Sequence, residues 1–219
     1  MIVAAILAKN EGDRYLRQVL QSLVPLTDMI LVLDDGSTDN TVEVAIEAGA
    51  VVKHRATTGM WGNESPARKE LWDWGSEVVG DGWLLIADAD QELVAPREVW
   101  RGLATSWCCH SWAFPLYDCW DSPQQFRIDG HWQGYRHPRP WLFRPSACPE
   151  PVWNPRGIHT GHAPANFPGP IGIAPKSIYW KHYGWMDREV RKAKMDRYLS
   201  TASLLTTDEL AHLHSAGDS

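Results

Sequence analysis

The first hundred residues alternate between short apolar runs and amphipathic helical patterns. Leu16, Val19, Leu20 and Leu23 recur at helical spacing between two runs rich in Val, Ile and Leu. Alternation of this kind builds a mostly parallel sheet with helices on both faces. A chain of 219 residues can bury one such core, so we predict a single α/β domain. The predicted strands span 2–7, 29–33, 51–52 and 83–86, and the predicted helices span 13–24, 38–49 and 66–79.

Polar clusters directly follow three of these predicted strands. Residues 9–11 follow the first strand, residues 34–35 follow the second, and Asp88 and Asp90 follow the strand at 83–86. Ligands of parallel sheets bind beyond the carboxyl ends of the strands. An Asp-x-Asp pair there can hold one divalent cation and leave positions open for phosphate oxygens. The sequence therefore predicts a site for a nucleoside diphosphate at this edge.

The character of the chain changes after about residue 103. Strands are predicted at 111–116 and 141–144, but 118–140 and 145–175 are rich in Pro, Gly, His and Trp. Such loops are too aromatic for disorder, so we expect an ordered, loop-rich substrate-binding half. The 13 tryptophans suit either core packing or stacking on sugars and bases. A last helix is predicted at 187–205, followed by a tail that frays.

Charge and cysteine content exclude several classes of protein. The net charge of −6 provides no broad basic field for nucleic acid or anionic lipid. The four cysteines match no zinc spacing, so we expect free thiols in a reducing, cytoplasmic setting. No Gly-x-Gly-x-x-Gly or Walker loop is present. No segment is long enough to span a membrane, and the first apolar run is interpreted as a strand rather than a signal peptide.

Four segments together resemble a known family. They are Ile6 to Glu11, Leu33 to Thr41, Pro66 to Lys69 and Ile86 to Asp90. In order and spacing they resemble the family 2 glycosyltransferases of the GT-A fold. The resemblance covers residues 1–93 and continues more loosely through 139–144 and 181–185. It implies one GT-A-type domain over 1–219, with a nucleotide-sugar half (1–103), an acceptor half with the last helix (104–205) and a flexible tail (206–219).

The resemblance implies a nucleoside pocket at the ends of the first two strands. Asp34 and Asp35 would meet the nucleoside, with one carboxylate accepting from a base N–H or a ribose hydroxyl. Ala8 and Asn10 would line the same pocket through backbone and side chain, next to Glu11. Two alternatives stay open, because Asp35 can form an Asx-turn with the glycine after it and Glu11 can be an early-helix charge.

The resemblance also implies a site for Mn²⁺ or Mg²⁺ on a diphosphate. Asp90 would bind the cation directly, and Asp88 would reach the ribose or a metal-bound water. His182 would complete the metal shell as a neutral imidazole. Arg68 would contact the base or the diphosphate. The alternatives are a satisfied structural role for His182 and a solvated helix face for Arg68.

No single residue is marked as the general base. Family 2 enzymes usually use an Asp or Glu in the second half, but residues 158–162 here read Ile-His-Thr-Gly-His where relatives often have His-Glu. We predict Asp121 and His159, because each lies in an aromatic, loop-rich stretch. The alternatives are Asp118, Asp129, Glu150 and His131. The basic residues of the last helix (Arg188, Arg191, Lys192 and Lys194) could reach a diphosphate, but a charged run of this kind is interpreted as a solvated face. His212 and His214 are interpreted as tail residues without a role.

The implied function is a metal-dependent glycosyltransferase that uses a nucleotide-diphosphate sugar, with UDP favoured, and that inverts the anomeric centre. The acceptor stays open between a saccharide, a lipid-linked acceptor, a peptide and a modified nucleic-acid base. Two other functions remain as alternatives. A sugar-1-phosphate nucleotidyltransferase needs a Gly-rich, Arg-containing loop that residues 8–13 do not supply. A non-catalytic nucleotide-sugar-binding module is supported only by the missing His-Glu.

Overall fold

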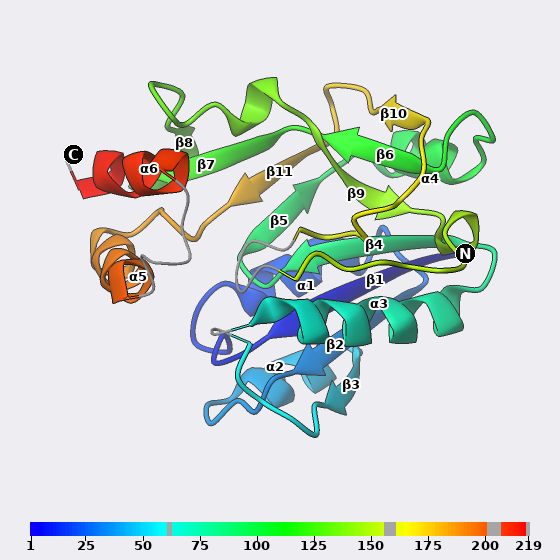
Figure 1. Ribbon diagram of the computed structural model, residues 1–219, viewed down its shortest axis with the longest axis horizontal. Helices are drawn as coiled ribbons and strands as arrows, with labels where there is room; N and C mark the ends of the chain where they lie inside the picture. Colours follow the sequence, from blue (N-terminus) through cyan, green and yellow to red (C-terminus); the bar gives the residue numbers. More distant parts are fainter. Residues whose placement is uncertain (61–62, 156–160, 201–206, 218–219) are drawn as a thin grey trace.

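The computed structural model describes residues 1–60, 63–155, 161–200 and 207–217, and these fold around a seven-stranded sheet (Figure 1). Among the described strands of this sheet, one runs against the other six, because β9 pairs antiparallel with both of its neighbours. The prediction of a mostly parallel α/β sheet is confirmed. The strands are, in spatial order, β10 (Ile171–Ile173), β6 (Ser111–Phe114), β9 (Arg139–Phe143), β4 (Trp83–Asp88), β1 (Ile2–Ala8), β2 (Met29–Asp34) and β3 (Val51–His54).

Helices cover both faces of this sheet, as predicted. Every residue of β1 is buried, which explains why the strand is apolar along its whole length. Alternate residues of β1 contribute to two separate cores, one on each face of the sheet. The first core includes residues of α1 (Leu16–Leu23), α2 (Thr41–Glu47) and α4 (Arg97–Ala104), and the second includes residues of α3 (Glu64–Val79).

Helix α3 begins two residues earlier than predicted. Pro66 therefore lies in the first turn, where a proline breaks no hydrogen bond of the helix. The helix ends at Gly80, whose φ of +55° is a left-handed conformation that glycine adopts without strain. This turn leads directly into β4, so that Asp88 stands at the carboxyl end of a central strand.

A second, four-stranded sheet stands beside the carboxyl end of β4. It consists of β5 (Gln91–Val94), β11 (Tyr179–His182), β7 (Leu116–Trp120) and β8 (Ser122–Phe126), in that order. In β11, His182 pairs with Gln91 on one side and with Asp118 on the other. Three segments far apart in the sequence therefore meet next to Asp90. Strands β7 and β8 and the short helix η1 (Gly134–Arg136) occupy much of the region that was expected to be loop.

The carboxyl-terminal residues fold into two helices at one end of the molecule (Figure 1). Helix α5 (Arg188–Ser200) agrees with the predicted last helix within the described residues. The expected flexible tail is wrong over residues 207–217, which form α6 (Thr207–Gly217). Leu213 and Ala216 of α6 are buried against Trp132 and Trp185. This apolar contact stabilises the helix, and it cannot be inferred from the sequence of the tail alone.

A short helix η2 (Pro145–Ala147) follows β9. All four cysteines are free thiols. Among the described residues, no helix is long and apolar enough to cross a bilayer.

Candidate functional site

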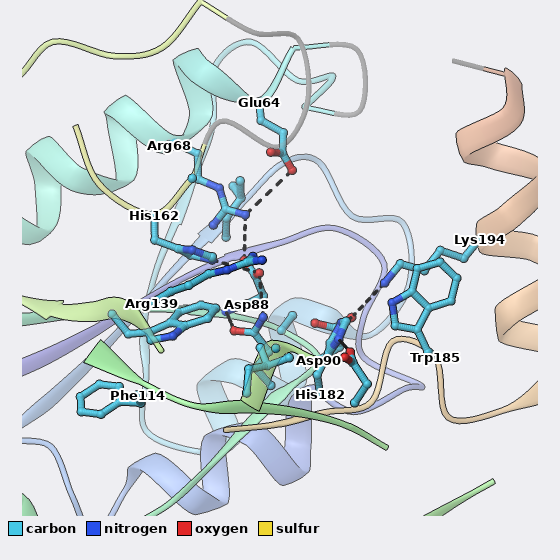
Figure 2. A pocket seen from close by; sticks show the side chains of 18 of the residues that line it. Glu64, Arg68, Asp88, Asp90, Phe114, Arg139, His162, His182, Trp185 and Lys194 are labelled. Carbon is cyan, nitrogen blue, oxygen red and sulfur yellow. Dashed lines mark hydrogen bonds and ion pairs between the residues drawn. The ribbon is translucent and has the colours of Figure 1, made fainter. Parts of the chain in front are cut away.

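A cavity of about 860 Å³ opens where β1 and β4 meet the second sheet. Its volume lies in the range of small-molecule sites. Asp88 and Asp90 line it, together with Arg68 of α3, His182 of β11 and Lys194 of α5 (Figure 2). Side chains from both halves of the chain thus share one cavity at the predicted edge of the sheet.

The Asp88 carboxylate is held by three protein side chains. Arg68 Nη2 donates to Oδ1 at 2.8 Å, and Gln91 Nε2 donates to Oδ2 at 3.1 Å. His162 Nε2 lies 3.1 Å from the same Oδ2. Burial opposes the charged form, but Arg68 and His162 hold the pKa of Asp88 well below its usual value. Asp88 is therefore an anion that fixes Arg68 in the cavity wall.

Asp90 belongs to a different group of contacts. Its Oδ2 lies 3.4 Å from His182 Nε2 and 3.9 Å from Lys194 Nζ. Burial opposes the charged form, yet His182 and Lys194 lower the pKa of Asp90 to about 2. On its other side His182 Nδ1 lies 2.7 Å from Asp118 Oδ1, so the imidazole bridges two carboxylates. Against its own burial, this pairing raises the pKa of His182 to about 9.

Asp90 and His182 fit one divalent cation as a pair of ligands. Two neighbouring ligand atoms of an octahedral cation lie about 3 Å apart, close to the separation of Asp90 Oδ2 and His182 Nε2. Asp118 would accept from His182 Nδ1 and keep Nε2 free for the metal. Among the described residues, no group of three or more His, Cys, Asp or Glu is arranged to hold a metal ion. A cation here would therefore need further ligands from a substrate or from water, while Asp88 keeps its own protein partners.

Arg68 carries hydrogen-bond donors that the described residues do not satisfy. Its Nη2 binds Asp88, but its Nε and Nη1 are buried and have no partner there. Glu64 Oε1 is 3.9 Å from Nη2 and does not relieve them. Unsatisfied buried donors are costly, so this pattern points to a ligand with acceptor atoms. The predicted contact with a base or a diphosphate stays a prediction that this geometry supports.

Asp35 is enclosed by protein donors and is not among the described residues that line the cavity. Its side chain is fully buried, and its Oδ2 accepts from the backbone N–H groups of Gly59 and Met60 at 2.9 Å. Arg55 pairs with its Oδ1, and Lys9 Nζ lies 3.4 Å from Oδ2. Although burial acts in the other direction, these donors lower the pKa of Asp35. Asp35 thus fixes the loop before α3, and its contact with a nucleoside stays a prediction.

Asp34 and Asn10 fix the loops that follow β2 and β1. Asp34 accepts from the backbone N–H groups of Gly36 at 3.2 Å and Ser37 at 3.1 Å. The Asx-turn that was an alternative for Asp35 is therefore formed by Asp34. Asn10 Oδ1 accepts from Thr38 N–H at 2.8 Å, and Asn10 N–H donates to Ser37 Oγ at 2.9 Å. Neither side chain is among the described cavity-lining residues.

Ala8 and Glu11 differ in their relation to the cavity. Ala8 is fully buried, and its carbonyl accepts the Asp35 N–H at 2.9 Å. Glu11 lines the cavity and accepts from Arg14 Nη1 at 2.9 Å. Because α1 begins only at Leu16, the alternative of an early-helix charge for Glu11 is wrong.

Asp121 lies away from the cavity, which contradicts the predicted role as a base. The side chain is 62% exposed, and its Oδ1 accepts from Arg191 Nη2 at 2.8 Å. Asp121 has a φ of +58° in the tight turn between β7 and β8, which aims the side chain at α5. The other predicted base, His159, lies outside the described residues. Of the alternatives, Asp118 and His131 line the cavity, whereas Asp129 and Glu150 do not.

Several cavity residues were not predicted as site residues from the sequence, among them His162, Lys194 and His212. His162 belongs to the run that replaces His-Glu, and that substitution was the signal that could have identified it. Lys194 was interpreted as part of a solvated helix face, but it is 11% exposed and points at Asp90. His212 of α6 lines the cavity and packs with its ring 4.1 Å from that of Trp132. The basic run around Lys194 did not distinguish a contact at the site from a solvated face, and His212 has no local signal. The positions of both residues depend on how α5 and α6 dock.

Comparison with known proteins gives consistent matches. The sequence profile described as glycosyl transferase family 2 matches residues 4–96. An uncharacterised glycosyltransferase of Rickettsia conorii is 39% identical over 92 residues, which are 42% of this chain and 29% of that protein. An uncharacterised protein of Mycobacterium bovis is 28% identical over 214 residues, which cover 90% of this chain and 50% of that protein. The chain thus spans half or less of the length of these relatives.

A solved structure extends the likeness beyond the first half. S. aureus TarS, residues 1–349, in complex with UDP, superposes with a TM-score of 0.58. The match covers 90% of this chain and 65% of that one at 14% identity, and so it reflects a shared fold. Residues 4–96 of this chain therefore match glycosyl transferase family 2 in sequence, and the chain has the GT-A fold.

Proposed function

We propose that this chain transfers a glycosyl group from a nucleoside-diphosphate sugar to an acceptor, with the help of Mn²⁺ or Mg²⁺. The observation that carries this proposal is the arrangement of Asp90, His182 and the unsatisfied Arg68 donors around one cavity. The match of residues 4–96 to glycosyl transferase family 2 supports glycosyl transfer as the reaction. UDP is the nucleotide we favour from the motifs, and TarS, which shares the fold, was crystallised with UDP.

The cavity residues fit the charge changes of this reaction. Cleavage of the anomeric C–O bond leaves negative charge on the diphosphate, and a bound divalent cation would supply the Lewis acid that neutralises it. Asp90 and His182 would hold that cation, and Asp118 would keep His182 in the correct tautomer. Arg68 would donate its free N–H groups to oxygens of the nucleotide, while Asp88 holds the guanidinium in place.

Binding of the donor is tested most simply by thermal shift. UDP-, GDP-, CMP- and TDP-sugars are compared, each with Mn²⁺ and with EDTA. We expect one nucleotide class to raise the melting temperature only when the metal is present. Asp90→Asn should abolish this rise, and Asp81→Asn, which changes an exposed aspartate between α3 and β4, should keep it. A flat panel with folded protein would contradict the proposed donor site.

Turnover distinguishes an enzyme from a binding module. When no acceptor is added, a glycosyltransferase can hydrolyse its donor slowly by transferring the sugar to water, and this reaction releases UDP. We expect metal-dependent UDP release by the wild-type chain and release slowed by about 10²–10³-fold in Asp90→Asn. Tight binding of a UDP-sugar without any release of UDP, in the presence of candidate acceptors, would favour the non-catalytic alternative instead.

A further inference from the structure

One part of the cavity lining is rich in basic groups and lacks acidic ones. Residues 131–139 contribute His131, His137 and Arg139 to the cavity, and this segment contains no Asp or Glu. The lining from the amino-terminal half is different, because Asp88 and Glu11 there already have Arg68 and Arg14 as partners. Residues 131–139 are therefore a basic segment of the cavity lining, while Asp88 and Glu11 are already paired with arginines. Asp118 and Asp208 also line the cavity, and Asp118 lies 2.7 Å from His182.

The register of the main sheet explains how Arg139 reaches the cavity. Strand β9 is antiparallel to β4, with Leu142 opposite Leu85 and Phe143 opposite Leu84. Moving towards the carboxyl end of β4 therefore means moving back along β9, which brings Arg139 to the end of the sheet where the cavity opens. Figure 2 shows the Arg139 side chain extending from β9 into the same cavity as His162 and Asp88.

The Arg139 guanidinium has no partner in the part of the chain that the structure describes. None of the hydrogen bonds or ion pairs found there includes this side chain, and it is exposed. Asp208 of α6 also lines the cavity, but it forms no ion pair with Arg139. The neighbouring Arg136 behaves differently, since it donates to Tyr135 Oη at 2.9 Å and does not line the cavity.

We propose that the acceptor of this enzyme carries an anionic group, a phosphate or a carboxylate, which Arg139 binds with help from His131 and His137. The planar guanidinium matches both anions by two parallel hydrogen bonds. The imidazoles add N–H donors on the same segment. A neutral acceptor that filled this side of the cavity would desolvate Arg139 without compensation. This inference rests on the proposed function, since it names the acceptor class for the same cavity.

The test uses three probes that share a three-carbon skeleton: glycerol 3-phosphate, glycerate and glycerol. Each is titrated by calorimetry into the full chain preloaded with UDP and Mn²⁺, so that the diphosphate side is filled. We expect one or both anions to bind and glycerol not to bind. Arg139→Met should weaken anion binding by at least about tenfold, because a charge-assisted bidentate contact is lost. Arg136→Met, which removes an arginine three residues away outside the cavity lining, should bind the anion as the wild type does.

The outcomes separate this inference from the proposed function. Anion binding that is equal in wild type and Arg139→Met, or absent in both, overturns the inference. Glycerol binding as tightly as the anions overturns it too. A loss of UDP affinity in Arg139→Met assigns the arginine to the donor and likewise overturns it. If UDP does not bind the wild type at all, the proposed function fails, and the same titrations on the free chain still decide whether Arg139 binds anions. The stronger of the two anions identifies the acceptor group as phosphate or carboxylate.

Discussion

Two pairs of acidic residues follow buried parallel strands in this molecule, and they have opposite environments. Asp34 and Asp35 at the end of β2 are 2% and 0% exposed, and protein donors surround them. Asp88 and Asp90 at the end of β4 have side chains that are 27% and 18% exposed, and both line a cavity. The first pair ties loops together, while the second faces space that a ligand can fill.

The difference lies in where the neutralising groups come from. At the end of β2 the backbone of the loop at Gly59 and Met60 supplies donors that leave no room at Asp35. At the end of β4 the partners are side chains, and Asp90 meets His182 and Lys194 only at 3.4 and 3.9 Å. Backbone donors close a site because they cannot turn away, whereas side chains can exchange a partner for a ligand.

Removal of the Asp35 carboxylate should have the largest effect, and it should act on stability. Asp35→Ala leaves the buried Arg55 without this partner, which should cost about 3–5 kcal/mol of unfolding free energy. Urea denaturation measures the loss. Glu47→Ala, which breaks an exposed pair with Arg17, should cost at most about 1 kcal/mol. Similar small losses for both variants would show that Asp35 does not stabilise the fold, and would contradict the contrast between the pairs at β2 and β4.

Asp90→Asn should instead act on turnover. Loss of a charged group that faces the leaving diphosphate should slow UDP release by about 10²–10³-fold. Its effect on unfolding free energy should be smaller than that of Asp35→Ala, since the Asp90 carboxylate is 3.4 and 3.9 Å from its side-chain partners and accepts no backbone N–H that the structure describes. Steady-state kinetics and denaturation on the same preparation check both parts. A variant that is destabilised yet turns over normally would reverse the two roles.

Arg68→Lys tests whether the cavity beside Asp88 and Asp90 binds the nucleotide. The ammonium keeps the charge next to Asp88 but cannot replace the Nε and Nη1 donors, so UDP affinity should fall by about tenfold. Lys69→Arg on the exposed side of α3 is a matched control and should leave affinity unchanged. Calorimetry with UDP gives both values. Full affinity in Arg68→Lys would mean that the unsatisfied donors do not meet the nucleotide.

Asp34→Asn should have the smallest effect. The amide oxygen can still accept from Gly36 and Ser37, and the lost pairing with His54 involves a largely exposed ring. The expected change in unfolding free energy is about 1 kcal/mol or less. UDP affinity measured alongside tests the predicted contact of Asp34 with the nucleoside. A large loss of affinity in this stable variant would show that Asp34 does bind the nucleoside.

The main sheet could be predicted because its strands are buried on both faces and therefore read as continuous apolar runs. β1, β2 and β4 fall where the sequence predicts them. β8 reads Ser-Pro-Gln-Gln-Phe, and β5 has only four residues, so neither has a periodic signal. β5 is a strand because it pairs with the distant β11, and β8 is a strand because it forms a hairpin with β7. α6 was missed because its apolar residues Leu213 and Ala216 pack against Trp132 and Trp185 of other segments. Its hydrogen bond between Ser215 and Trp132 joins residues 83 positions apart.

Residues of the candidate site could be predicted where the neighbouring sequence marks them, and not where only tertiary packing places them. Asp88 and Asp90 follow an apolar run directly, and His182 lies in a segment that resembles the family; all three were predicted as site residues, and all three line the cavity. The same signal at Asp34 and Asp35 did not show that Gly36 and Ser37 would bind Asp34 or that the loop before α3 would enclose Asp35. Asp121 was predicted because the residues around it are aromatic and loop-forming, but local composition does not show where a side chain points. Lys194 and Arg139 depend on helix docking and strand register.

The most direct measurement is Mn²⁺ binding followed by electron paramagnetic resonance, with and without UDP, in the wild type, Asp90→Asn and Asp35→Asn. The end of β4 is the donor site if UDP promotes Mn²⁺ binding in the wild type, Asp90→Asn loses it, and folded Asp35→Asn keeps it. Mn²⁺ binding by Asp90→Asn that equals that of the wild type would contradict the account.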